Sequence, residues 1–476
     1  MFFGREEQLS RLAGLWNKRV SSFVTCRGRR RIGKSSLIEK FAELSNCRFI
    51  EITGAAIQPK MNNASQLRHF SEQLCNQSTL PKGVAVDSWM TAFQLLDSVI
   101  SDEERTVVLL DEVSWMGKFD PDFAGALKTV WDKSLKKHDR LVLVVCGSVS
   151  TWIQRNILEN TAFAGRLSLN LVVDELPLRL CAGFWGERAN RLTPSELIDV
   201  LSVTGGVPKY LEEIDPTVSA AENIRRMCFL PDGPLVDEFD QIFSEVFEES
   251  AEFKKKILRS LSDGPLTGKD IAAAMGVDRN GYLTRSLEEL ETAGFVAKEG
   301  GLNPATDAPL KCCSYRIRDN YTRFYLHHLE PRRMAIKDGS FAFTSLEQLP
   351  GWHAIAGLQF ENLVVSHYQE LLPRLNPSRA LIKSAAPYRK GGKGGLQIDL
   401  LLQMERALYV VEVKHQRKIS REIEREMSEK IARLAGKTGK SVRVALVYDG
   451  ELDSAVVESG YFDVLVSSSE LLGLEG

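Results

Sequence analysis

The chain has 476 residues, of which 43% are hydrophobic and 26% are charged, and its formal net charge is -2. This length exceeds what one hydrophobic core usually supports, so we expect about three domains. The near-neutral charge excludes a globally basic nucleic-acid coat protein, and any nucleic-acid surface must be local.

The start of the chain and its cysteines indicate a cytoplasmic protein. Charges in the first seven residues occupy positions where a secretory signal needs apolar side chains, and the longest apolar run, 141–146, is too short to span a bilayer. The eight cysteines include no Cys-x-x-Cys pair, and the adjacent Cys312 and Cys313 suit neither zinc nor an easy disulfide. We expect reduced, mostly packed thiols.

The first 150 residues alternate apolar runs typical of strands with segments of helical period. This alternation predicts a parallel sheet covered by helices. The predicted strands are 22–26, 48–52, 106–110 and 141–146. A helix over 35–44 places its apolar residues at helical spacing, so one of its faces is expected to pack on the sheet.

A phosphate-binding motif lies between the first predicted strand and this helix. The run Gly28-Arg29-Arg30-Arg31-Ile32-Gly33-Lys34-Ser35 fits G-x-x-x-x-G-K-[ST], and Ser36 follows it. In such a loop the backbone N–H groups and the helix N-terminus face the phosphates, the lysine reaches the outer phosphates and the serine binds Mg²⁺. The sequence therefore predicts a site for ATP and Mg²⁺ in residues 28–36.

The acids that such a site needs follow the strand 106–110, as Asp111 and Glu112. Asp111 is expected to hold Mg²⁺ through water, and Glu112 to act as general base on the attacking water. An apolar strand that ends in Asp-Glu is common by itself. The phosphate loop makes the assignment specific.

Two further residues have open assignments. Ser148 follows the strand 141–146 and either contacts the γ-phosphate or its attacking water, or caps the next helix. Arg166 either answers phosphate charge, in the same subunit or in a neighbouring one, or is a surface arginine. A role across subunits would favour rings or dimers.

The middle of the chain is expected to be mainly helical. Residues from about 160 to 250 contain one interruption, Gly205-Gly206-Val207-Pro208, and resemble a lid. Three predicted helices follow, 252–261, 267–275 and 280–293, and two short strand-like pieces lie near Val296 and Tyr315. This is the element order of a winged helix-turn-helix.

The third of these helices is the predicted recognition helix. Its N-terminal end offers polar and basic side chains, whereas Glu288, Glu289 and Glu291 would repel a phosphate backbone. Two interpretations stay open: the helix reads DNA, or, as a resemblance to STAND-like ATPases implies, the winged helix packs on the nucleotide domain and relays its state, which fits this charge pattern better. The polar and basic residues are Arg279, Asn280, Tyr282, Thr284 and Arg285.

The last part of the chain carries a second set of acids. Asp399 lies on an apolar strand, and thirteen positions later Glu412 and Lys414 emerge on one face of the next strand. Asp399 and Glu412 can bind a divalent metal, while Lys414 positions or deprotonates the attacking water. Glu361, on the preceding helix, supplies a third carboxylate. The alternative is a charged pair on a solvated strand face.

A basic stretch without acids precedes Asp399. We interpret it as a mobile loop suited to a phosphate backbone, and a solvated β-turn is the alternative. Its cations are Arg379, Lys383, Arg389, Lys390 and Lys393, and Gly391-Gly392 and Gly394-Gly395 form the predicted hairpin tip.

Several motifs in order resemble the archaeal-type ATPases of the AAA+/STAND group, over roughly the first 330 residues. The resemblance implies that Arg5 lies near the nucleotide and Pro208 against the adenine, and that the lid and winged helix move with nucleotide state. The motifs are Phe3-Gly4-Arg5-Glu6, the phosphate loop, the 106–112 strand, Cys146-Gly147-Ser148-Val149, Ala164-Gly165-Arg166 and the 205–211 segment.

Asp399 followed by Glu412-Val413-Lys414 is similar to the PD-(D/E)XK nuclease superfamily, which has the restriction-endonuclease-like fold, over about the last 120 residues. The predicted fold class is α/β, with an α/β domain at each end of the chain. The predicted domains are a P-loop ATPase core (1–160), a helical lid (161–250), a winged helix-turn-helix (251–320), a helical linker (321–352) and a nuclease-like domain (353–476).

The leading hypothesis is an ATPase that gates a nuclease acting on DNA, with Mg²⁺ or Mn²⁺ at the nuclease site. The chief alternative is an ATP-dependent regulatory or signalling switch that binds DNA or a partner protein through its winged helix, with a non-catalytic tail. A P-loop kinase or transporter subunit is disfavoured, because no small-substrate motif accompanies the phosphate loop. A homo-oligomer is compatible with either of the first two.

Overall fold

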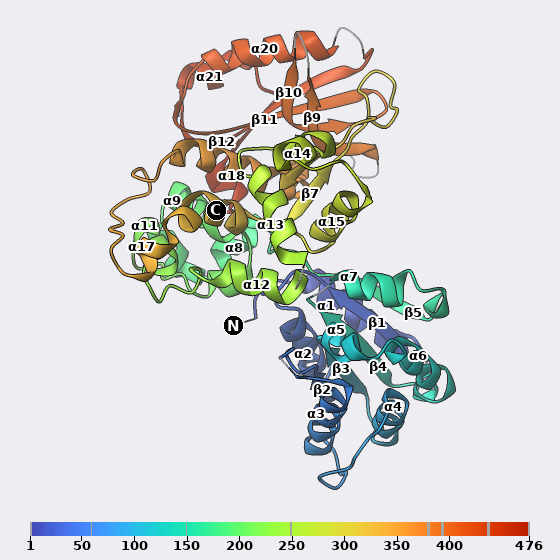
Figure 1. Cartoon of the computed structure of the whole chain (residues 1–476). Helices are drawn as coiled ribbons and strands as arrows, with labels where there is room; N and C mark the ends of the chain where they lie inside the picture. Colours follow the sequence, from blue (N-terminus) through green and yellow to red (C-terminus); the bar gives the residue numbers. More distant parts are fainter. Residues whose placement is uncertain are drawn as a thin grey trace. The chain divides into compact units, whose positions relative to one another are not determined.

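The chain forms two compact units, Met1–Asp174 and Glu175–Gly476. In this computed structural model the described residues are 2–58, 60–148, 150–247, 250–377, 381–391, 395–435 and 438–474. Figure 1 shows the elements of both units, coloured along the sequence.

The first unit is built on a five-stranded parallel sheet with the order β2-β3-β4-β1-β5. The central strands β3 and β4 are buried along their whole length, as expected for parallel strands covered on both faces. The α/β prediction is therefore confirmed. The strands are β1 (Ser22–Arg27), β2 (Arg48–Thr53), β3 (Thr106–Asp111), β4 (Leu141–Gly147) and β5 (Leu167–Val172).

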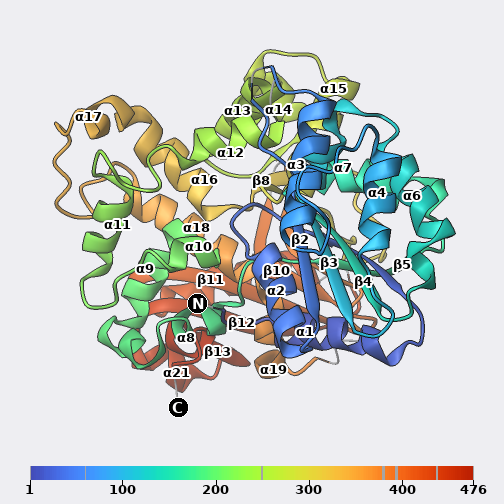
Figure 2. The ribbon, with the colours of Figure 1, turned by 90° about the horizontal axis from the view of Figure 1, so that it is seen from below.

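Helices cover this sheet on both sides, as Figure 2 shows. Helices α3, α4 and α6 enclose an aromatic cluster in which Phe70, Trp89 and Phe93 pack in edge and tilted contacts. Helices α1 and α2 lie on the other side. The helices are α1 (Glu6–Ala13), α2 (Lys34–Leu44), α3 (Asn63–Asn76), α4 (Trp89–Ser98), α5 (Val113–Met116), α6 (Phe123–Lys133) and α7 (Ser150–Ile153).

Strand β5 was not predicted from the sequence, because residues 167–172 fall within the segment predicted to be a helical lid (161–250). It pairs in parallel with β1 at the sheet edge, and its residues are mostly half-buried or exposed. The alternation of Leu167, Leu169 and Leu171 with polar residues is its sequence signal. The first compact unit thus reaches Asp174.

The second unit begins with helices and continues into a small sheet. Strands β6, β7 and β8 form this sheet in the order β6-β8-β7. Across the described part of the chain, no helix has the length and apolar character needed to cross a bilayer. The elements are α8 (Leu178–Gly183), α9 (Pro194–Thr204), α10 (Pro208–Leu211), α11 (Ala220–Cys228), α12 (Glu238–Phe247), α13 (Ala251–Ser260), β6 (Leu266–Thr267), α14 (Gly268–Met275), α15 (Gly281–Thr292), β7 (Val296–Glu299), β8 (Ser314–Ile317), α16 (Asn320–Phe324) and α17 (Arg333–Lys337).

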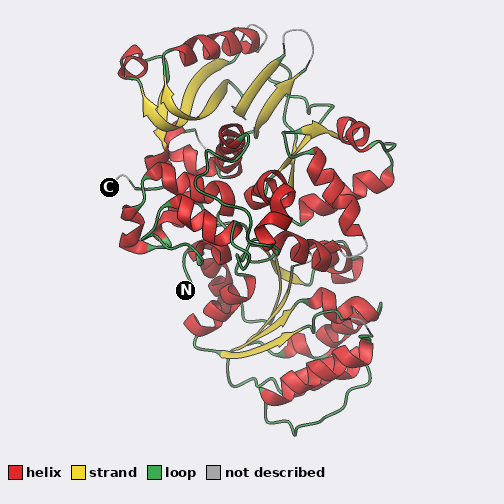
Figure 3. Cartoon of the chain, turned by 60° about the vertical axis from the view of Figure 1, so that its left-hand side comes forward, coloured by secondary structure: helices red, strands yellow, loops and turns green. Residues whose placement is uncertain are grey.

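The C-terminal part of this unit contains a second five-stranded sheet, with the order β13-β12-β11-β10-β9. Strands β9 to β11 are antiparallel, whereas β11 to β13 are parallel. Figure 3 draws these strands in yellow, and Figure 1 shows α18 and α20 on opposite sides of the sheet. The elements are α18 (Trp352–Ser366), α19 (Leu372–Leu375), β9 (Ser384–Lys390), β10 (Leu396–Gln403), β11 (Ala407–Ile419), α20 (Glu422–Ala435), β12 (Ser441–Leu452), α21 (Ser454–Ser459), β13 (Val464–Ser467) and α22 (Ser468–Leu471).

Buried polar contacts join the segments of the second unit. Gln359 on α18 donates to the carbonyl oxygens of Ser202 on α9 and Asn320 on α16, and its own oxygen accepts from Arg323 at 2.8 Å. All four side chains are at most 2% exposed. Since an unpaired polar group would be costly at this depth, the contacts fix how α9, α16 and α18 pack.

A buried ion-pair group connects the small sheet to the C-terminal sheet. Glu299 on β7 lies 3.0 Å from Arg316 on β8 and also pairs with Arg389 on β9, which reaches Glu361 on α18 at 3.2 Å. Burial lowers the pKa of Arg316 to about 10. The four charges are therefore stable in this position only because they neutralise one another.

Removal of one member of this group should destabilise the second unit. We expect Glu299→Ala to cost about 3–5 kcal/mol of unfolding free energy, because it leaves Arg316 and Arg389 without their shared acid. Denaturant unfolding measures the change. Glu222→Ala, which removes a half-exposed partner of Arg225 on α11, is the control and should have little effect. Equal effects of the two variants would contradict the prediction.

Candidate functional site

The backbone of the loop between β1 and α2 turns at residues with positive φ. Gly28 has φ 158°, Arg31 has φ 70° and Gly33 has φ 82°. A Cβ atom on Gly28 would collide with the carbonyl oxygen of Val173, so only glycine fits there. Arg31 pays the conformational cost of a non-glycine residue in the left-handed region, which is typical of functional loops.

Lys34 and Ser35 begin α2 directly after this loop. The Lys34 ammonium is buried and donates to the carbonyl oxygen of Arg29 at 3.0 Å, so the side chain folds back across the loop. The Ser35 hydroxyl donates to the carboxylate of Asp111 at 2.5 Å. The first turn of α2 and the last residue of β3 therefore meet, as the motif requires.

The Ser35–Asp111 pair has the chemistry of a magnesium site. A hydroxyl and a carboxylate oxygen are ligands that a hard divalent cation prefers, and Asp111 is only 8% exposed. The other Asp111 oxygen accepts from the backbone N–H of Glu112 at 2.8 Å, which fixes the carboxylate. The residues fit Mg²⁺, and Ser35 and Asp111 are the ones that would hold it.

Glu112 is oriented by Ser148 at the end of the neighbouring strand. One oxygen of Glu112 accepts from the Ser148 hydroxyl at 2.5 Å and the other from the Ser148 backbone N–H at 3.1 Å. Glu112 itself has φ 49°, an uncommon conformation for a non-glycine residue. Ser148 therefore orients Glu112. The sequence predicted for Ser148 either a contact with the γ-phosphate or its attacking water, or a helix cap, and did not predict this contact.

The other predicted nucleotide residues lie around this loop. Arg5 is 7% exposed and donates to the Ile32 carbonyl oxygen at 3.2 Å, which ties the start of the chain to the loop. Arg29 and Ile32 are buried, Arg30 is half-buried, and Ser36 is exposed on α2. Pro208 begins α10 in the second compact unit, and its predicted contact with adenine stays a prediction.

Arg166 lies away from the phosphate loop and its acids. It precedes β5, which runs parallel to β1, so it lies at the amino ends of the strands, whereas the phosphate loop follows the carboxyl end of β1. Its guanidinium forms two 2.8 Å hydrogen bonds with Asp132. The role within the same subunit is therefore wrong for this structure, and the role in a neighbouring subunit stays a prediction.

A second group of charges lies on β10 and β11. The Asp399 carboxylate accepts from the backbone N–H of Val413 at 2.9 Å. The two oxygens of Glu412 lie 3.0 Å from the Lys414 ammonium and 2.6 Å from that of Lys430. Both carboxylates are buried, at 7% and 2% exposure, and the β9–β10 register shifts at Asp399, as at a bulge.

The charges of this group perturb one another. The pKa of Asp399 is raised to about 7 by burial and by the negative charges of Glu412 and Glu361. Burial opposes the charge of Lys414, but the nearby Glu412 and Glu426 outweigh burial and raise the pKa of this lysine. Lys414 is therefore protonated and can position a phosphate or a water, whereas the predicted role in deprotonation is disfavoured.

Lys430 and Glu426 were not among the predicted site residues. Both come from α20, the helix that connects β11 to β12. Glu426 contacts Lys414 at 3.3 Å, and Lys430 contacts Glu412. Their spacing of four residues, which puts both on one helix face, was the available signal, but the sequence did not show that this face meets β11.

Two parts of the C-terminal prediction need correction. No three His, Cys, Asp or Glu side chains in the described ranges are grouped to hold a metal ion, and Glu361 pairs instead with Arg389. The predicted trio of Glu361, Asp399 and Glu412 is thus reduced to Asp399 and Glu412. In the basic stretch, Lys383 is bound to Asp307 and Glu405. The other cations predicted there are Lys390, which is exposed, and Arg379 and Lys393, which lie outside the described residues.

Comparison with known proteins supports the first site. Residues 2–214 match the family described as an ATPase domain predominantly from Archaea. An uncharacterised protein of Methanocaldococcus jannaschii is 23% identical over 404 residues, 84% of each chain. An uncharacterised ATP-binding protein of the same organism is 44% identical over 43 residues, which are 9% of this chain and 73% of that protein.

Among solved structures, a Walker-type ATPase of Pyrococcus abyssi matches with a TM-score of 0.50 and 17% identity, over 68% of this chain and 96% of that one. This likeness concerns the fold. Together with the family match, it confirms that residues 2–214 form an archaeal-type, P-loop ATPase domain. These matches do not identify the C-terminal sheet as a nuclease.

Nucleotide binding should depend on Lys34. We expect Lys34→Ala to weaken ATP binding about 10- to 100-fold, because a charge-assisted hydrogen bond contributes about 1.5–3 kcal/mol. Isothermal titration calorimetry measures the affinity. Lys40→Ala removes a half-buried lysine, paired with Glu43, from the same helix and should leave the affinity unchanged. Unchanged affinity in Lys34→Ala would contradict the assignment of the loop.

Proposed function

We propose that ATP binding and hydrolysis by the N-terminal domain control a metal-dependent nuclease in residues 353–476 that acts on DNA. The observation that carries the nuclease proposal is the convergence of Asp399, Glu412 and Lys414 from adjacent strands. Two buried carboxylates beside a protonated lysine are suited to bind a divalent cation and a phosphate together.

At the nucleotide site the proposed roles follow from the contacts within the first unit. Lys34 leaves the Arg29 carbonyl oxygen and binds the outer phosphates. Glu112, held by Ser148, accepts a proton from the attacking water. Mg²⁺, held by Ser35 and Asp111, would neutralise the charge that develops on the phosphates.

At the C-terminal site, Asp399 and Glu412 would hold a divalent cation, Mg²⁺ or Mn²⁺, which polarises a scissile phosphate when bound. Lys414 donates to a phosphate oxygen or orients the attacking water. Burial, and after it the charges of Glu412 and Glu361, raise the pKa of Asp399, and a cation bound between the carboxylates would offset both effects.

Gating is proposed to pass through the second unit. The predicted lid (161–250) contributes α9, and the predicted winged helix (251–320) contributes β7 and β8. Gln359 links α9 to α18, and Arg389 links β7 to α18. A movement of the lid or the winged helix therefore acts directly on α18, whose Glu361 influences Asp399.

The alternative is a regulatory switch with a non-catalytic tail, which binds DNA or a partner protein through its winged helix. One observation favours it: both oxygens of Glu412 are paired with lysines, which balances its charge without a cation. Cleavage assays separate the two functions, because only the first predicts product.

The nuclease proposal predicts nicking or cutting of plasmid, linear or single-stranded DNA by the wild type with Mg²⁺ or Mn²⁺, dependent on ATP. Asp399→Ala and Lys414→Gln should abolish cleavage and leave ATP binding intact, because their contacts lie in the second unit. Glu405→Ala, which removes an acid that is 77% exposed in the β10–β11 turn, is the control. A wild type that shifts DNA on a gel without cleaving it would support the regulatory switch.

The hydrolysis proposal makes a separate prediction for Glu112. We expect Glu112→Gln to bind ATP with wild-type affinity but to hydrolyse it about 10²–10⁴ times more slowly, because the amide cannot accept the proton. Phosphate release in single-turnover mixtures measures the rate. Glu39→Gln, an exposed change on α2, serves as control. An unchanged rate in Glu112→Gln would assign the base elsewhere.

A further inference from the structure

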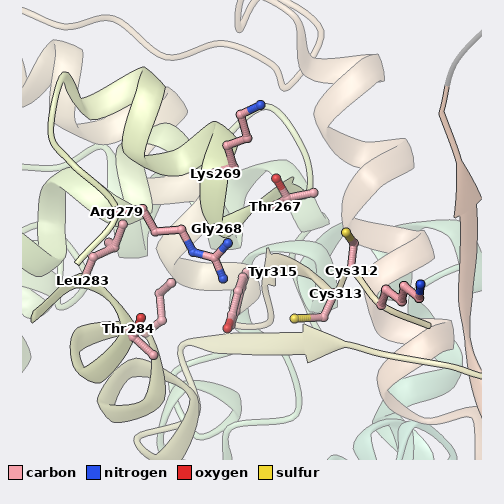
Figure 4. Close-up of a pocket in the computed structure, with 11 residues that line it drawn as sticks. Thr267, Gly268, Lys269, Arg279, Leu283, Thr284, Cys312, Cys313 and Tyr315 are labelled. Atoms are coloured by element: carbon pink, nitrogen blue, oxygen red, sulfur yellow. The ribbon is translucent and has the colours of Figure 1, made fainter. Parts of the chain in front are cut away.

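A pocket of about 220 Å³ lies where α14, α15 and the chain before β8 meet (Figure 4). It is smaller than the pockets of about 300–1,000 Å³ that enclose whole small-molecule ligands, so it suits one group of a larger ligand. Its lining includes Lys269, Arg279, Thr284, Lys311, Cys313 and Tyr315.

The cations of this pocket are unpaired. Within the part of the chain that the structure describes, Lys269, Arg279 and Lys311 have no ion-pair or hydrogen-bond partner. Elsewhere in the same unit the basic side chains Lys254 and Arg316 are each bound to an acid. Three unpaired cations around one small pocket leave positive charge available to an anion.

The centre of the pocket is occupied by Arg279 and polar groups. Figure 4 shows the Arg279 guanidinium directed toward Tyr315, with Thr284 and Cys313 nearby, while Lys269 extends away at the rim. The Nε atom of Arg279 lies 3.9 Å from the position that a Cβ on Gly268 would take. A guanidinium has a fork of donors that matches two oxygens of a phosphate group.

The surface beside the pocket has features of a nucleic-acid contact. Tyr282, in the first turn of α15, is 49% exposed, and exposed aromatic rings next to cations stack on bases. Arg285 adds a further exposed and unpaired cation among the described residues. Of the nearby acids, Asp270 is engaged by the Thr267 hydroxyl at 2.7 Å, and Asp278 lies in the preceding turn.

The acidic half of α15 restricts the direction of approach. The charges of Glu288 and Glu291 contribute to the raised pKa of Tyr315, after burial and Cys313. They lie further along α15 than Thr284. A strand that carries phosphates must therefore enter from the Arg279 side, at the N-terminal end of the helix.

We propose that this pocket binds a phosphate group of a DNA strand, with Arg279 as the principal donor and Lys269 and Lys311 at its sides. The proposal rests on the proposed action on DNA and names the place where the strand is held. It is independent of the base contacts that were expected from α15. The contact is to the backbone and should not depend on DNA sequence.

Fluorescence anisotropy with labelled duplex and single-stranded DNA tests the proposal on the full chain, in EDTA so that cleavage cannot occur. For the duplex, the triple variant Arg279→Gln, Lys269→Gln and Lys311→Gln should lower the magnitude of the slope of log K against log salt concentration by about 0.9 in total, because the three cations neutralise one phosphate, and Arg279→Gln alone should account for most of this change. Affinity should fall equally for unrelated sequences. Lys256→Gln, an exposed and unpaired lysine of α13 within the described residues, is the matched control.

The outcomes separate this proposal from the proposed function. If the wild type binds DNA and Arg279→Gln behaves like Lys256→Gln, the pocket assignment is wrong while action on DNA stands. If the wild type binds no DNA, both are wrong. Binding of inorganic phosphate or ATP to Lys34→Ala that disappears when Arg279→Gln is added would identify a free phosphate as the ligand and overturn the assignment to DNA. An unchanged midpoint of denaturant unfolding verifies that Arg279→Gln is folded.

Discussion

The hydrogen bond between Ser35 and Asp111 joins the two halves of the nucleotide site, and the rest of the ATPase unit serves to hold it. Ser35 is fixed because α2 starts directly after a loop with three positive φ angles, one of them at a position where only glycine fits. Asp111 is fixed because β3 is buried between β2 and β4. The parallel topology then brings Glu112 and Ser148 to the same edge, since parallel strands end on one side of the sheet.

The parts of this site that were predictable are those with local signals. The strands β1, β3 and β4 are continuous apolar runs because helices cover both of their faces, and the loop carries its own spacing of glycines. Strand β5 was missed because an edge strand is half exposed and carries a weak alternating pattern. The prediction that Arg166 lies near the phosphates failed for the same reason. Only the direction of β5 shows that this arginine lies at the edge of the sheet opposite the phosphate loop.

The C-terminal site shows a different limit of the sequence. The positions of Asp399, Glu412 and Lys414 on adjacent strands could be predicted from their spacing, because a hairpin connects β10 and β11. Their partners could not, because Lys430, Glu361 and Arg389 come from elements whose packing depends on the whole fold. The sequence therefore suggested Glu361 as a third metal ligand. In the structure Glu361 is bound by Arg389 of β9, a residue that the sequence placed in a free basic loop.

The same arginine shows how a movement elsewhere in the second unit can change the C-terminal site. Arg389 balances Glu299 on β7 and Glu361 on α18 at once, and its charge opposes the rise that burial causes in the pKa of Glu361. If β7 moved away with Glu299, Arg389 could follow it and leave Glu361 unbalanced beside Asp399. Without Arg389, the Glu361 and Asp399 carboxylates would together hold a proton to higher pH, and the site would lose negative charge that it needs to bind a cation. Within the proposed function, gating thus requires only the exchange of one ion pair, without rearrangement of β10 or β11.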